Sequence, residues 1–488
     1  MRESKRVTAK RWNLGAGQAV AALLLLSCGP GCSTDDRSVA LESASAQPNL
    51  PGSMNTPGGA GAAAQAGSTS STTPAPSSNG EGPVQPGMLV PSPGDTSNTG
   101  PGPFVPDPNA PPGAQHWVGT WAGSPYYDSG NQPPASLSNA VLRQVVHISL
   151  GGSQFRFQFS NLFGNGPVTI ASAHIALCTA TPAVDSTIDP ATDTALAFSG
   201  SASATIAQGQ ELWSDPINFP IAALGNVSIT TAFGSVPSSV VGHSGSRTTS
   251  YLQAGSSDVS AASMASAQTT DHWYYISGID VMADTAALAA VAIGDSITDG
   301  RGTDTNKNNR WTDILAARLQ ANAATAHVAM LNQGIGATSL VGTSGTAAQA
   351  RFNRDVLGQS SVRYAIVFDG VNDIGGGAQF AGMKAAYDDM IARAHAKGVL
   401  IYGATILPFG ANSYYSAAHE AVRVQVNEYI KSGAFDGYID FEAAVTDGQN
   451  PPKLDTVSAT WAQQDGLHPG PAGYQKIGDA ADLTMFAR

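Results

Sequence analysis

From residue 286 onward, short apolar runs alternate with helical patterns, and this alternation constrains the fold more than any other feature of the chain. Runs typical of buried strands occur at 287–293, 328–331, 364–368, 399–406 and 438–441. Helical patterns occupy 311–321, 347–357, 380–397, 416–432 and a last segment that begins at Pro471. Strands that alternate with helices form parallel sheets with right-handed crossovers. We therefore predict an α/β domain over 286–488, a five-stranded, doubly wound, flavodoxin-like sheet with strand order 2-1-3-4-5.

The preceding region, 114–285, has a different pattern. Apolar and polar residues alternate with a period of two, between short segments rich in Gly, Asn, Pro and Ser, at 140–150, 154–159, 168–177, 226–231 and 274–281. This is the pattern of half-buried strands. We predict a β-sandwich of jelly-roll type. Its aromatic residues Trp117, Trp121, Phe155 and Phe157 are expected in the core, with a carbohydrate-contacting face as the alternative.

The first 27 residues have the features of an export signal. Basic residues precede an apolar run at 19–26 that is too short to span a bilayer. The run ends in Leu-Leu-Ser-Cys at 25–28, which resembles the lipobox of bacterial lipoproteins. We predict a lipoprotein-type signal peptide, lipidation of Cys28, and a location in the bacterial cell envelope or outside the cell. An ordinary signal peptide with an incidental Cys28 is the alternative.

Residues 28–113 consist mainly of Pro, Gly, Ser, Ala and Thr. Such a segment buries too little apolar surface to offset the entropy of ordering, so we predict a disordered linker. The net charge is −12 and no basic patch interrupts it, which argues against a nucleic-acid partner. Apart from Cys28, the cysteines are Cys32 and Cys178; a free, buried Cys178 is expected rather than a disulfide.

Polar motifs follow the first three predicted strands of the α/β domain. Gly-Asp-Ser occupies 294–296, Asn-Gln-Gly-Ile-Gly-Ala occupies 332–337, and Gly-Val-Asn-Asp occupies 370–373. In a doubly wound sheet, ligands bind beyond the carboxyl ends of the strands. With the predicted strand order these three ends are neighbours, so a serine, a glycine-rich turn and an asparagine amide are expected to converge.

A base for this serine is found near the carboxyl terminus. Among the nine histidines, only His468 has an aspartate, Asp465, three residues before it. A carboxylate at this spacing can hold an imidazole in one tautomer while its other nitrogen faces the serine. The chain has no Gly-x-Ser-x-Gly elbow, and His419-Glu420 lacks the second histidine of a zinc-protease helix. We predict no metal and no cofactor.

Taken together, these motifs resemble the blocks of the SGNH (GDSL) hydrolases. Residues 294–300 (Gly-Asp-Ser-Ile-Thr-Asp-Gly) are similar to the first block, 332–337 to the second, 370–373 to the third, and 465–469 (Asp-Gly-Leu-His-Pro) to the last. The resemblance implies a catalytic triad of Ser296, His468 and Asp465. It also implies an oxyanion hole that combines the Ser296 amide, a second-block amide and the Asn372 side chain. Asp295 and Asp373 are expected to fix loops as hydrogen-bond acceptors. The β-rich region is similar to the amino-terminal domain of a bacterial branch of carbohydrate esterases.

Ala337 departs from the family pattern, which usually has glycine at the oxyanion position. Only a backbone N–H is needed there, so alanine can serve if its φ is negative and is strained if the turn requires a positive φ. The adjacent Gly336 amide is the alternative donor.

The resemblance implies a secreted serine esterase. No long apolar lid separates the blocks, which favours short acyl groups, and O-acetyl groups on a polysaccharide are the expected substrate. We expect an acylated carbohydrate or small ester as partner, membrane contact only through a lipid anchor, and leave the oligomeric state open. Two alternatives remain: an O-acyltransferase with the same triad, and a non-catalytic carbohydrate-binding lipoprotein.

Overall fold

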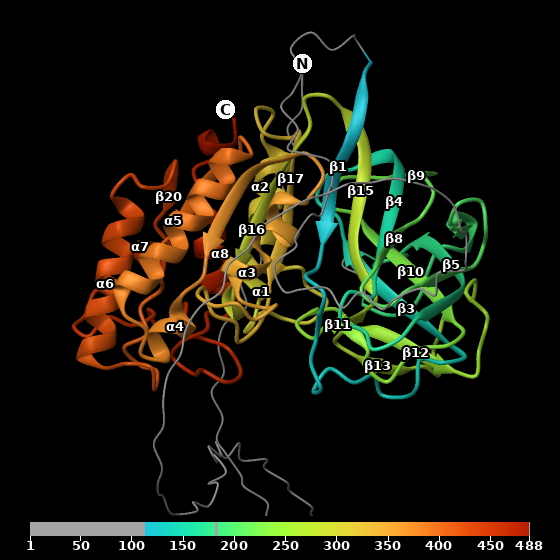
Figure 1. The fold of residues 1–488 in the computed structure, drawn as a ribbon, viewed down its shortest axis with the longest axis horizontal. Helices are drawn as coiled ribbons and strands as arrows, with labels where there is room; N and C mark the ends of the chain where they lie inside the picture. The colour runs from blue at the N-terminus through green and yellow to red at the C-terminus, as the bar shows by residue number, and fades with distance from the viewer. Residues whose placement is uncertain (1–112, 181–183, 488) are drawn as a thin grey trace, which may run out of the picture. The chain divides into compact units, whose positions relative to one another are not determined.

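The computed structural model describes residues 113–180 and 184–487, which belong to one compact unit of the chain (Figure 1). The predicted signal peptide, Cys28, Cys32 and nearly all of the predicted linker lie outside the described residues. Within the described residues, no helix is both long and apolar enough to cross a bilayer.

The carboxyl-terminal half contains a five-stranded parallel sheet. Its spatial order is β17, β16, β18, β19 and β20, which confirms the predicted order 2-1-3-4-5. The strands are β16 (Leu288–Gly294), β17 (Val328–Gly334), β18 (Val362–Phe368), β19 (Leu400–Ala404) and β20 (Gly437–Ile439). Every residue of β16 is buried, because the strand is central and helices cover both faces of the sheet.

The helices around this sheet pack in two groups. One group contains α2 (Trp311–Ala321), α7 (Phe441–Val445) and α8 (Pro471–Asp479). The other contains α3 (Ala348–Phe352), α5 (Phe380–Ala396) and α6 (Ala417–Lys431). Two short helices, α1 (Ser296–Asp299) and α4 (Val371–Gly375), begin directly after the carboxyl ends of β16 and β18. A 3₁₀ turn, η3 (Leu483–Phe486), follows α8. The predicted α/β fold class is confirmed.

An antiparallel β-rich domain precedes the parallel sheet, as predicted. One sheet pairs β1 (Gln115–Ala122), β15 (Ile276–Asp284), β4 (Gly152–Ser160), β8 (Glu211–Trp213) and β9 (Ile217–Ile221). A second contains β13 (Gln268–Thr270), β12 (Ser250–Ala254), β3 (Ala140–His147), β10 (Asn226–Phe233), β5 (Val168–Leu177), β6 (Thr194–Ala195) and β7 (Ala204–Ile206). A small third sheet joins β14 (Trp273–Tyr274), β11 (Val241–His243) and β2 (Tyr126–Tyr127). A 3₁₀ turn, η1 (Pro190–Thr192), lies between β5 and β6.

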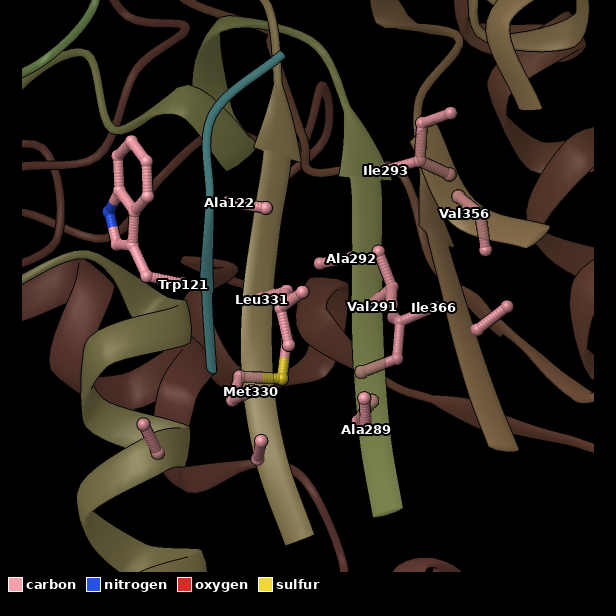
Figure 2. Close-up of a cluster of buried hydrophobic side chains, with 14 of the residues drawn as sticks. Trp121, Ala122, Ala289, Val291, Ala292, Ile293, Met330, Leu331, Val356 and Ile366 are labelled. Atoms are coloured by element: carbon pink, nitrogen blue, oxygen red, sulfur yellow. The ribbon is translucent and has the colours of Figure 1, made fainter. Parts of the chain in front are cut away.

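The two sets of sheets share one continuous hydrophobic core. β1 lies against β17, and Figure 2 shows Trp121 and Ala122 of β1 beside Met330 and Leu331 of β17. The contact is close, since a side-chain carbon at Gly119 would lie 2.9 Å from Cδ2 of Leu331. The β-rich domain is therefore packed onto an edge strand of the parallel sheet. The predicted domain boundaries at 113/114 and 285/286 remain predictions.

Three local features differ from, or refine, the predictions. The helix predicted over 347–357 is α-helical only to Phe352 and continues as a π-helical turn, η2 (Asn353–Leu357). Trp121, Phe155 and Phe157 are core residues, whereas Trp117 is half-buried beneath the guanidinium of Arg156. Cys178 is a free, half-buried cysteine, and burial raises the pKa of its thiol to about 12, so the thiolate is disfavoured.

Candidate active site

Ser296 stands at the sharp turn between β16 and α1. A side-chain carbon at Gly294 would lie 2.2 Å from the carbonyl oxygen of Phe368, so only glycine fits where the strand ends. Asp295 then caps the helix, as its Oδ1 accepts a hydrogen bond of 2.9 Å from the amide of Ile297. Ser296 is the first helical residue, and its own N–H therefore has no acceptor within the helix.

The structure brings Ser296, His468 and Asp465 together. Oγ of Ser296 is 2.7 Å from Nε2 of His468, and Nδ1 of His468 is 2.7 Å from Oδ2 of Asp465. The other oxygen of Asp465 accepts hydrogen bonds from the backbone amides of Leu467 and His468. Because the carboxylate is held by its own loop, it fixes the imidazole with Nε2 directed at the serine hydroxyl. This arrangement can transfer the serine proton to an imidazole.

Burial and charge set the protonation of the imidazole. Burial lowers the pKa of His468; the hydrogen bond and charge of Asp465 oppose this change, and the guanidinium groups of Arg301 and Arg247 add to it. For Asp465, burial favours a higher pKa, but the hydrogen bonds from the His468 amide and ring outweigh it, and its pKa is lowered. His468 is therefore neutral near pH 7 and available as a base.

Asn372 reaches this site from the start of α4. Gly370 precedes the helix with a φ of 124°, a conformation that glycine adopts readily. Nδ2 of Asn372 donates to the carbonyl oxygen of Thr338 at 2.8 Å, and its Oδ1 accepts from the hydroxyl of Tyr414 at 3.1 Å. The two contacts fix which side of the amide is the donor, and they leave one N–H of Nδ2 for another acceptor.

The second-block turn lies against α1. A side-chain carbon at Gly336 would lie 4.0 Å from Cβ of Ser296, which places this glycine next to the serine. Ala337 follows with a φ of 60°, and its side chain is exposed. The sequence left the sign of φ at Ala337 open, and the turn adopts the conformation with positive φ. Ala337 is therefore strained, and Gly336, which lacks a positive φ, is the unstrained residue of this turn.

Three carboxyl groups lie behind these turns. Asp373 accepts hydrogen bonds from the amides of Leu340 and Val341, and it fixes the loop after the second block, as expected. Burial, together with the neighbouring charge of Asp373, raises the pKa of Asp295 to about 7. Asp369 is buried, neither of its side-chain oxygens has a hydrogen-bond partner, and burial raises its pKa well above the usual range. A neutral Asp369 avoids an unpaired buried charge.

Sequence reasoning missed the loop after β19. Nδ2 of Asn412 donates to the carbonyl oxygen of Asp465 at 2.7 Å, and Tyr414 contacts Asn372 as described. This loop therefore connects the backbone of Asp465 with the side-chain amide of Asn372. Trp461 was also missed; its ring meets His468 edge to face at 6.0 Å. The available signal was positional, because Asn412 and Tyr414 follow the carboxyl end of the fourth parallel strand. Within the described segments, no three His, Cys, Asp or Glu side chains are grouped to hold a metal ion.

Comparison with known proteins identifies the family of part of the chain. Residues 292–476 match the model of the GDSL-like lipase/acylhydrolase family. This part of the chain is therefore a GDSL-like lipase/acylhydrolase domain, which confirms the resemblance inferred from the four blocks. No curated protein matches the chain.

Several solved structures are similar to part of the chain. A member of the lipolytic G-D-S-L family from Veillonella parvula is 21% identical, covers 41% of this chain and 100% of its own, and has a TM-score of 0.31. An α/β hydrolase from the metagenome of Lake Arreo is 21% identical, with coverage of 40% and 94% and a TM-score of 0.31. An acetylxylan esterase from Geobacillus stearothermophilus is 18% identical, with coverage of 40% and 91% and a TM-score of 0.31.

The lowered pKa of His468 leads to a prediction that requires no substrate. In a nuclear magnetic resonance titration, the His468 ring should lose its proton with a midpoint below 6.5. Arg301→Gln should move this midpoint upward, because it removes a positive charge that disfavours the imidazolium. Arg363→Gln, at the amino end of β18, is the matched control and should leave it unchanged. A midpoint above 6.5 in the unmodified protein would contradict this electrostatic account.

The positive φ of Ala337 leads to a second prediction. An alanine in the left-handed region costs roughly 1–2 kcal/mol, and glycine there loses about 0.4–1 kcal/mol of chain entropy. Ala337→Gly should therefore raise the free energy of unfolding by about 0.5–1 kcal/mol, measured by chemical denaturation. Ala286→Gly is the control: this alanine is also exposed, lacks a positive φ, and should lose stability on the same change. A loss of stability in Ala337→Gly would contradict the strain.

Proposed function

We propose that the protein is a serine esterase in which Ser296 is the nucleophile, His468 the general base and acid, and Asp465 the group that orients His468. The observation that carries the proposal is the pair of 2.7 Å contacts joining Ser296 to His468 and His468 to Asp465. In the first step, Oγ of Ser296 attacks the ester carbonyl while Nε2 of His468 takes the hydroxyl proton. The resulting imidazolium is stabilised by the carboxylate of Asp465.

The tetrahedral intermediate carries a negative charge on the former carbonyl oxygen. We propose that the N–H of Ser296, an N–H of the Gly336–Ala337 turn and the remaining N–H of Asn372 stabilise this oxyanion. The contacts of Asn372 to Thr338 and Tyr414 support its part, because they hold the amide before substrate arrives. His468 then gives its proton to the leaving alcohol, and an acyl group remains on Ser296. A water molecule, deprotonated by His468, releases the acid and restores the serine.

Short acyl esters, with O-acetyl groups on a polysaccharide as the leading case, are the substrates that we propose. Two residues that contact the triad support this choice: the ring of Trp461 meets His468, and the amide of Asn412 donates to Asp465. Aromatic and polar groups of this kind suit the faces and hydroxyls of sugar rings. The same acyl-enzyme could pass its acyl group to a sugar hydroxyl in place of water. Product analysis with and without a sugar acceptor separates hydrolysis from transfer.

The triad is tested by one variant and a panel of esters. Hydrolysis of 4-nitrophenyl esters from acetyl to long acyl, and of acetylated xylan, should be fastest for the acetyl compounds. Ser296→Ala should remove this activity to the residual given by binding and oxyanion stabilisation, with the fold retained by circular dichroism. Ser344→Ala, at an exposed serine, is the control. Near-unchanged turnover in Ser296→Ala would refute the nucleophile.

We also propose that the exported protein carries lipid on Cys28, as the lipobox-like Leu-Leu-Ser-Cys at 25–28 suggests. Cells that express the full chain should incorporate a palmitate analogue into the protein, and Cys28→Ser should abolish the label. Cys32→Ser, four residues later, is the matched control and should keep it. Unlabelled protein released into the medium would instead indicate an ordinary signal peptide.

A further inference from the structure

A second aspartate–histidine pair lies close to Ser296 and joins the β-rich domain to the catalytic domain. Nε2 of His243, the last residue of β11, is 2.9 Å from Oδ1 of Asp299, the last residue of α1. The relative exposures of the two residues are only 5% and 4%. A carboxylate out of water requires a hydrogen-bond partner, because loss of that partner leaves a costly buried charge.

The His243 ring is held on every side. Its Nδ1 is 3.0 Å from the backbone carbonyl oxygen of Ser124, and the rings of Tyr126 and Trp273 flank it at 5.8 Å. Both hydrogen-bond partners of the ring are acceptors, so an imidazole that carries a hydrogen on each nitrogen satisfies both. Burial opposes ionisation of Asp299, but the charge and hydrogen bond of His243 outweigh it, and the pKa of Asp299 is lowered.

Asp299 in turn packs against the oxyanion turn. A side-chain carbon at Gly334 would lie 2.3 Å from the amide nitrogen of Asp299, and one at Gly336 would lie 3.4 Å from its Oδ2. On its other side, a side-chain carbon at Gly245 of the β-rich domain would lie 1.9 Å from the same oxygen. The carboxylate of Asp299 is thus enclosed between a loop of the β-rich domain and the second-block turn.

Ser124, which holds Nδ1 of His243, also reaches the strand ends. Its hydroxyl lies 2.6 Å from Oε1 of Gln333 and 2.7 Å from Oδ2 of Asp355. The buried guanidinium of Arg351 pairs with this carboxylate and donates to the carbonyl oxygens of Gly294 and Gln333. A continuous set of contacts therefore runs from Asp299 through His243 and Ser124 to the ends of β16 and β17.

We propose that His243, supported by Ser124, is a positioning residue for catalysis. It holds Asp299, and Asp299 holds the turns of Ser296 and Gly336–Ala337 in the geometry that oxyanion stabilisation requires. This inference rests on the proposed esterase function. It gives the β-rich domain a part in the reaction itself, since one of its side chains supports the turns that bear the nucleophile and the oxyanion donors.

The size of the expected effect follows from the oxyanion hole. Loss of one oxyanion donor reduces kcat by roughly 10²–10³, and a catalytic group is effective only within about 0.5 Å of its productive position. Displacement of the turn should therefore lower kcat by about 10–100-fold and leave KM nearly unchanged, because the oxyanion exists only in the transition state.

The test compares three variants of the full chain. His243→Leu removes both hydrogen bonds, whereas His243→Gln places an amide N–H near Nε2 and should recover part of the activity. His174→Leu is the matched control, because Nδ1 of His174 also contacts an aspartate, Asp193, at 2.9 Å in the same β-rich domain, on β5. For each folded variant, kcat and KM on 4-nitrophenyl acetate, the affinity for a boronic acid that forms a tetrahedral adduct with serine, and the rate of labelling by an organophosphonate are measured.

The inference expects kcat, boronic acid affinity and labelling rate to fall together in His243→Leu, to fall less in His243→Gln, and to stay unchanged in His174→Leu. If His243→Leu does not fold, a wild-type kcat in His243→Gln would overturn the inference. It is also overturned if folded His243→Leu loses only thermal stability and keeps all three values. Failure of the proposed function looks different, since the unmodified protein would then neither hydrolyse esters nor react with the phosphonate at Ser296.

Discussion

The buried guanidinium of Arg351 is the interaction on which the turns after β16 and β17 depend. It donates to carbonyl oxygens near the carboxyl ends of two adjacent parallel strands, that of Gly294 in β16 and that of Gln333 in β17, and pairs with Asp355 at 3.0 Å. The carbonyl oxygen of Gly294 also accepts from the amide of Ile335, so the guanidinium adds a charged donor to a group that the backbone already pairs. It also fixes the separation of the two strand ends from which the nucleophile turn and the second-block turn depart. Asp355 lies in η2, the π-helical turn that follows α3. Single π-helical turns of this kind are frequent at functional sites.

The parts of the structure that one contiguous segment determines could be predicted from the sequence. The apolar run that became β16 and the helical pattern of α2 depend on local periodicity, and the predicted helix over 311–321 matches the observed bounds. Asp465 and His468 lie in one loop, so their spacing alone indicated the contact between them. The placement of Ser296 and Asn372 after the carboxyl ends of two paired strands followed from the strand order, because these ends meet at one edge of the sheet.

The remaining parts depend on contacts between segments far apart in the chain. His243 lies in a three-residue strand whose sequence has no catalytic signature, and only the packing of the β-rich domain brings it to Asp299. Tyr414 similarly contacts Asn372 across 42 positions of sequence. The φ of Ala337 could not be predicted, because alanine favours negative values and the surrounding turn imposes a positive one. Strain of this kind persists where neighbouring contacts over-determine the backbone, and it gathers near functional sites.

The continuous core limits how the two domains can be separated and recombined with others. β17 is an edge strand of the parallel sheet, and the chain packed against it, β1, comes from the other end of the described sequence. A fragment that began near residue 286 would uncover Met330 and Leu331 and leave an apolar sheet edge in water, which is a template for self-association. Recombination of this catalytic domain with unrelated binding modules would therefore require a redesigned edge strand.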